Sequence, residues 1–174
     1  MRKRNKNKPN QTGRNRTTRF ARLDHSLLNS PAYRALSVAA RALLVELTML
    51  DNGENNGSLY LSIRDAAGRL GMADLSAVRS AFDELQELGF IEMTEDASFH
   101  VKAAEKSRAR CWRLNWLAGP GRKGPSMTFM ERQPQPDTKA HKRMERGMRA
   151  LKAYRKDRDS GRLPVLDSDT LAGN

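Results

Sequence analysis

Cysteine and histidine are scarce in this sequence: it has one cysteine, Cys111, and three histidines far apart, His25, His100 and His141. A single cysteine excludes an internal disulfide and fits a reducing compartment, which favours the cytoplasm. No cysteine–histidine spacing fits a zinc site, so we expect neither a metal nor a cofactor.

Long apolar runs are also missing. No stretch reaches the length that a membrane span needs, and the N-terminus lacks the apolar core of a signal peptide. Patterns of catalytic residues are equally absent: no Ser-His-Asp, Cys-His or paired-carboxylate arrangement stands out, and the glycine-rich segment 119–124 has no Gly-Lys-Ser/Thr ending. The sequence therefore predicts no enzyme, no small-molecule ligand and no membrane partner.

Basic residues, in contrast, are plentiful: 32 Lys and Arg stand against 20 Asp and Glu, which gives a net charge of +12. Residues 1–22 carry nine basic and no acidic side chains, residues 23–101 carry five and twelve, and residues 102–174 carry eighteen and eight. An acidic middle between two basic flanks indicates a polyanionic partner, with nucleic acid favoured over an anionic membrane surface.

Composition divides the chain into five segments. Residues 1–22 are expected to be a disordered basic arm, because they have too few apolar side chains to offset the entropy of ordering. Residues 23–118 are predicted to fold as one domain, and residues 119–137, rich in Gly and Pro, to form a linker. A basic helix is expected at 138–158 and a disordered tail at 159–174.

Four capping residues predict the helices of the domain. Ser30 before a proline begins a turn through residue 35, and Ser37 begins a helix to about residue 50. Ser62, with Asp65 three residues later, begins a helix that ends at Gly71. Asp74 begins another that ends at Gly89, and its apolar stripe is expected in the core: Leu75, Val78, Phe82 and Leu85.

Short strands are predicted at residues 59–61, 90–94 and 110–116, the last two forming a hairpin. Within 110–116, alternation places Trp112, Leu114 and Trp116 toward the core, and Cys111, Arg113 and Asn115 outside. The predicted fold class is therefore mainly α with a small β-hairpin (α+β).

Three stretches of this pattern, 61–72 (LSIRDAAGRLGM), 78–85 (VRSAFDEL) and 88–91 (LGFI), resemble the winged helix-turn-helix superfamily. They look most like small replication and regulatory proteins of bacteria, plasmids and phages. The resemblance covers about residues 30–117. It implies that the helix at about 74–88 enters the DNA major groove and that the hairpin, or wing, reaches the DNA backbone.

Carried onto this sequence, the resemblance implies base contacts from Ser76, Arg79 and Ser80, of which Arg79 is the one long donor. Backbone contacts are expected from Arg64, Lys102, Lys106, Arg108, Arg110 and Arg113. The charge of the N-terminal arm adds contacts from Arg2, Lys3, Arg4, Lys6 and Lys8. The same helix carries the acidic residues Asp74, Asp83, Glu84 and Glu87, which repel phosphate unless they point inward or away. Affinity is therefore expected mainly from the wing and arms.

The expected function is that of a non-catalytic DNA-binding protein, nucleoid-associated and acting in transcription regulation or DNA replication. Its expected partners are double-stranded DNA and, as a candidate, a second copy of the chain. Two alternatives stay open: the acidic helix at 74–88 could bind a basic protein, and the basic arms could bind RNA. Arg79 could also pair with Asp83, four residues on, instead of contacting a base.

The basic helix at 138–158 has several possible roles. His141, Met144, Met148 and Leu151 share one narrow face of it, surrounded by Lys and Arg. Such a helix is marginal in isolation. It could dock on the domain, pair with a second chain, fold against nucleic acid or remain solvated.

Overall fold

The computed structural model describes residues 20–95, 110–119 and 124–162, and the account below concerns those residues. They combine helices with a small antiparallel sheet, which confirms the expected mixture of α and β structure. The elements, in chain order, are α1 (His25–Leu28), α2 (Pro31–Ala35), α3 (Val38–Leu50), β1 (Leu59–Tyr60), α4 (Ile63–Leu70), α5 (Leu75–Glu87), β2 (Ile91–Glu95), β3 (Cys111–Leu114), the 3-10 helix η2 (Thr128–Met130) and α6 (Lys139–Asp159).

The helices begin where the capping residues predict. Ser30, Ser37 and Ser62 each accept a hydrogen bond from the backbone N–H three residues on. Asp74 accepts from the N–H groups of Ser76 and Ala77, two and three residues on. These bonds satisfy N–H groups that the first turn of a helix leaves without a partner. Gly71 ends α4 in the left-handed conformation, at φ 65°.

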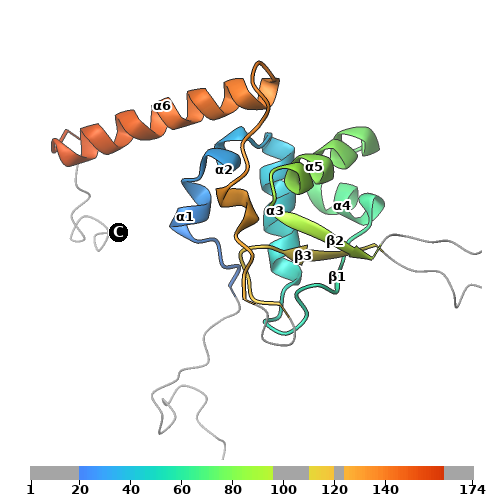
Figure 1. Cartoon of the computed structure of the whole chain (residues 1–174). Coiled ribbons are helices and arrows are strands. Elements are labelled where there is room, and N and C mark those ends of the chain that lie inside the picture. The colour runs from blue at the N-terminus through green and yellow to red at the C-terminus, as the bar shows by residue number, and fades with distance from the viewer. Residues whose placement is uncertain (1–19, 96–109, 120–123, 163–174) are drawn as a thin grey trace, which may run out of the picture.

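α3 lies between α1 and α2 on one side and α4 and α5 on the other (Figure 1). The sheet has the order β1-β3-β2, so β3 is its central strand. β2 and β3 are the two strands of the expected hairpin, and β1 pairs with the other edge of β3. Trp112 of β3 is fully buried, stacks on Phe82 of α5 with ring centroids 4.7 Å apart, and donates its indole N–H to Leu61 O at 3.0 Å. This indole therefore joins the sheet to the α4–α5 pair.

Two predictions of side-chain direction are wrong. Leu75 is 44% exposed, because it is the first residue of α5 and lies beyond the edge of the core. Asn115 is only 4% exposed, because β3 ends at Leu114 and the chain turns, so that alternation stops there. The Asn115 amide donates to Gly89 O at 2.9 Å.

The segment after β3 packs on the domain, although residues 119–137 were expected to be a linker. Phe129 of η2 is fully buried and stacks on Phe90, with ring centroids 5.1 Å apart. Gly89, at φ 76°, permits this approach, since an added Cβ would lie 3.0 Å from the carbonyl carbon of Thr128. Arg132 donates to Gln86 O and Glu87 O, at 3.2 and 2.9 Å, and so caps the C-terminal end of α5.

α6 docks on the domain and lies over α2 (Figure 1). Arg143 makes two of the contacts: Nε donates to Ala35 O at 2.7 Å, and Nη2 donates to Glu84 Oε1 at 3.0 Å. Ala140 and Met144 pack against the edge of the core. Of the roles considered for the basic helix, the described residues thus form the docked arrangement. None of the described helices is long and apolar enough to cross a membrane.

Candidate nucleic-acid interface

The α4–α5 pair positions the three residues expected to contact bases. Gly71 reverses the chain after α4, and the Met72 N–H donates to Ala67 O at 2.9 Å to close the turn. Val78, Phe82 and Leu85 bury one face of α5. Ser76, Arg79 and Ser80 are exposed away from that face, as the spacing requires.

Arg79 is fully available to a ligand. Its side chain is exposed and makes no hydrogen bond or ion pair with any residue that the structure describes. The alternative pairing with Asp83 on the next turn is therefore not formed. A guanidinium in this state presents all five N–H donors to solvent.

Ser76 is more constrained than Arg79. Its hydroxyl donates to Asp74 Oδ1 at 2.7 Å, so its oxygen can accept a hydrogen bond but its proton is already used. That hydroxyl, with the N–H groups of Ala77 and Ser76, lowers the pKa of Asp74 below its ordinary value of 3.8. Because Asp74 already occupies these N–H groups, the start of α5 is closed to a phosphate.

Glu84 does not face outward with the other acidic residues of α5. Its Oε2 accepts from the N–H of Ser37 at 2.8 Å, at the start of α3, and its Oε1 accepts from Arg143. Glu84 is thus one of the acids that points inward, and an arginine and a helix N-terminus offset its charge. Asp83 and Glu87 are exposed.

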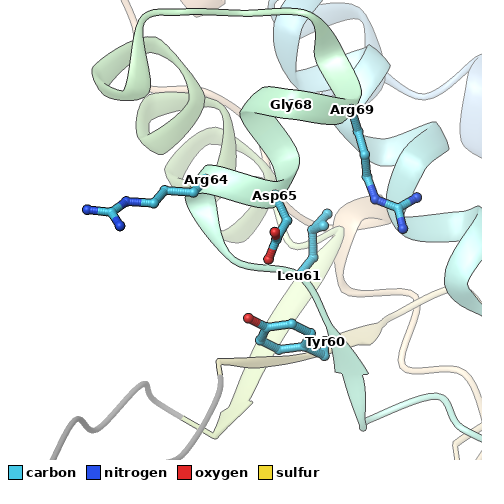
Figure 2. A pocket seen from close by; sticks show the side chains of 6 residues that line it. All are labelled: Tyr60, Leu61, Arg64, Asp65, Gly68 and Arg69. Carbon is cyan, nitrogen blue, oxygen red and sulfur yellow. The ribbon is translucent and has the colours of Figure 1, made fainter.

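A shallow pocket of about 400 Å³ lies between β1 and the outer side of α4. Tyr60, Asp65 and Arg69 line it, and the Arg64 side chain extends away from the domain (Figure 2). Arg69 is paired with Glu46 of α3, at 3.4 Å between Nη1 and Oε2. Arg64 thus remains available for a phosphate, as the resemblance implies.

Tyr60 is a feature of this region that its sequence position did not reveal. It is 51% exposed on the edge strand β1, whereas a tyrosine in a short strand is more often packed. Alternation with the buried Leu59 and Leu61 is the pattern that could have placed it outside.

Two arginines, Arg113 in β3 and Arg110 just before it, make internal contacts. Arg113 is half-buried, and its Nη2 donates to Gly124 O at 3.2 Å, so this side chain joins β3 to the segment before η2. The guanidinium of Arg110 lies 5.9 Å from the centre of the Trp112 ring. Both side chains are therefore less accessible than the expected backbone contacts require.

The remaining predicted contacts lie outside the described residues: Lys102, Lys106, Arg108, Arg2, Lys3, Arg4, Lys6 and Lys8. Within the described part of the chain, no group of three His, Cys, Asp or Glu side chains could hold a metal ion. Burial, with a smaller contribution from the charge of Glu95, raises the pKa of the Cys111 thiol and so disfavours the reactive thiolate.

Comparison of the chain with protein-family models, with curated proteins and with solved structures gave no match.

Proposed function

We propose that this protein is a non-catalytic DNA-binding protein of the winged helix-turn-helix kind, acting in transcription regulation or DNA replication. In this proposal α5 enters the major groove, while the wing between β2 and β3 and the basic arms contact phosphates. The observation that carries it is the exposed side of α5, where Arg79 has no partner among the described residues and Ser80 lies beside it.

The direction of α5 supports the proposal. In helix-turn-helix proteins the N-terminal residues of the recognition helix contact the base edges. Arg79 lies in the second turn of α5, whereas the exposed acids Asp83 and Glu87 lie one and two turns further on. Bases would therefore meet the arginine before they meet the carboxylates, and an arginine suits the two acceptors of guanine.

Selection from a pool of random duplexes tests this function. The full chain should enrich a motif, and Arg79→Ala should lose the preference at one guanine and bind the selected duplex about 5- to 150-fold more weakly, which is 1–3 kcal/mol. Glu54→Ala, on the exposed loop before β1, is the matched control. An unchanged motif and affinity in Arg79→Ala would contradict the role of α5.

The salt dependence of affinity tests the role of the basic segments. Each neutralised phosphate contributes a slope of about −0.9 to the plot of log affinity against log salt concentration. We expect a steep slope for the full chain. A flat plot would show that the basic segments do not bind the backbone.

A second candidate function is supported by the exposed acids of α5, since Asp83 and Glu87 could bind a basic protein. Asp83→Lys separates the two functions. If α5 binds DNA, the new charge strengthens duplex binding, because it replaces repulsion by attraction. If α5 binds a basic protein, duplex binding is unchanged and the protein complex is lost.

A further inference from the structure

The outer face of α6 is strongly basic, and the proposed DNA site on α5 does not use it. Two exposed side chains of α6 are acidic, Glu145 and Asp159, and Asp159 is paired with Arg158 at 2.9 Å. The exposed basic side chains of α6 are Lys139, Lys142, Arg146, Arg149, Lys152, Arg155, Lys156 and Arg158.

Docking fixes the direction of this face. Arg143 binds Ala35 and Glu84, and Gly147 lies so close to α2 that an added Cβ would be 3.0 Å from the Arg34 Cβ. The half-buried side of α6 therefore cannot turn outward. Lys142, Arg149 and Lys156, spaced by seven residues, lie close to one line on the opposite side and extend about 21 Å along the helix.

This row of cations has no acidic partner among the residues that the structure describes. The side chains of Lys142, Arg149 and Lys156 make no hydrogen bond or ion pair with a described residue, and the same is true of Arg146 and Lys152 between them. Like charges three and four residues apart destabilise a helix. A bound polyanion would remove that repulsion.

We propose that the outer face of α6 binds the backbone of a second DNA duplex, so that one molecule holds two duplexes at once. α6 begins beside α5, where Arg143 binds Glu84, and runs over α2 and past α1, so its later turns lie away from α5 and from the ends of β2 and β3, where the first duplex is proposed to bind (Figure 1). The inference adds a site to the proposed function and rests on the first duplex binding at α5.

Duplex DNA fits this face better than a membrane or single-stranded RNA. A helix that lies on a membrane needs an exposed apolar face, and the apolar side of α6 is the side that docks. Single strands are bound through aromatic rings, and Tyr154 is the one exposed aromatic side chain on α6. The backbone of a duplex requires neither, because phosphates bind Lys and Arg directly.

A capture assay on the full chain tests the second site. One selected duplex is immobilised, the protein is bound to it, and retention of a second, fluorescent duplex of unrelated sequence is measured. Lys142→Gln/Arg149→Gln/Lys156→Gln should reduce retention at least tenfold and change binding of the first duplex less than threefold. The matched control, Lys139→Gln/Arg155→Gln/Arg158→Gln, removes the same charge from α6 away from the line and should retain most of the capture.

Each result decides the proposal. Equal loss from both triple variants, no capture by the wild type, or preferential capture of RNA over the second DNA duplex would overturn it. The circular dichroism spectrum establishes that α6 is intact in both variants. Arg79→Ala distinguishes failure of the proposed function from failure of the second site. This substitution should change binding of the first duplex and leave intact the contribution of α6 to the slope of log affinity against log salt concentration.

Discussion

Asn56 holds together the loop before β1 and the end of β3. The residue is 2% exposed; its Oδ1 accepts from the N–H of Leu114 at 2.7 Å, and its Nδ2 donates to Leu114 O at 2.9 Å. Leu117 O and Ala118 O also lie 3.1 Å from Nδ2. One side chain thus satisfies both polar groups of Leu114 where β3 ends.

Asn56→Ala should destabilise the protein by about 2 kcal/mol or more, because a buried N–H and buried carbonyls then lose their partner. Urea unfolding monitored by tryptophan fluorescence measures the change. Glu54→Ala, two residues away and exposed, is the control and should change stability by less than about 0.5 kcal/mol. Equal effects of the two substitutions would show that Asn56 does not hold the loop.

Ionisation of Asp74 makes the stability of the folded protein depend on pH. Its hydrogen bonds lower the pKa of the folded state below the ordinary value of 3.8. The folded state is therefore favoured while the carboxyl is ionised, at pH above 3.8, and this contribution is lost as the pH falls through the folded-state pKa.

We expect the difference in urea midpoint between wild type and Asp74→Ala to be constant above about pH 5 and to shrink in stronger acid. Asp74→Asn retains a capping side chain without the charge, so its own contribution should not follow the titration. A difference that stays the same down to pH 2 would exclude this carboxyl as its source.

At the scale of the element, α6 depends on a glycine that would be unfavourable elsewhere. Glycine in the interior of a helix costs about 1 kcal/mol relative to alanine. At Gly147, however, a Cβ would lie 3.0 Å from the Cβ of Arg34 in α2 and would press on the stem of that side chain. The close approach therefore favours glycine at this position.

Gly147→Ala should weaken the docking of α6 although alanine is the better helix former. Hydrogen exchange of the amides in α6 measures this, with faster exchange expected in the variant. Ala153→Gly, at an exposed position of the same helix, is the reverse control and should lower the helix propensity without affecting Arg143. Slower exchange in Gly147→Ala would mean that the contact with Arg34 yields easily.

The boundaries of these elements were readable from the sequence where a local contact determines them. Ser37 and Ser62 bond to residues three positions away, and Gly71 adopts its own left-handed conformation, so neighbouring residues carry the information. The winged arrangement, and the use of α5 as a recognition helix, remain predictions.

Contacts between distant residues could not be predicted in the same way. The partners of Glu84 lie 47 and 59 residues away, at Ser37 and Arg143, and an acidic residue among other acids indicated a solvated face. Phe129 lay among glycines and prolines typical of a linker, and its burial depends on Phe90. In both cases the tertiary partner, and not the local pattern, decides the position.

At the scale of the whole molecule, the domain extends past residue 118. Phe129 fills the core beside Phe90, and Arg132 caps α5, so the chain up to Ala118 lacks two contacts that the described structure contains. Removal of a buried phenylalanine side chain costs about 3–5 kcal/mol.

Residues 20–118 should therefore be less stable than residues 20–137 by about 3 kcal/mol or more. Thermal unfolding of the two chains measures the difference, and Phe129→Ala in the full chain should reproduce most of it. Equal unfolding temperatures for the two truncated chains would show that η2 adds nothing to the core.

Glu84 also couples the docking of α6 to the assembly of the rest of the domain. Its carboxylate joins the start of α3 to α5, and the Arg143 side chain then reaches both this carboxylate and the last carbonyl of α2. The Ala35 carbonyl and the Glu84 carboxylate lie next to each other only when α2, α3 and α5 are packed together. Because α6 is synthesised after α2, α3 and α5, its docking on the ribosome requires that these three helices have already packed together.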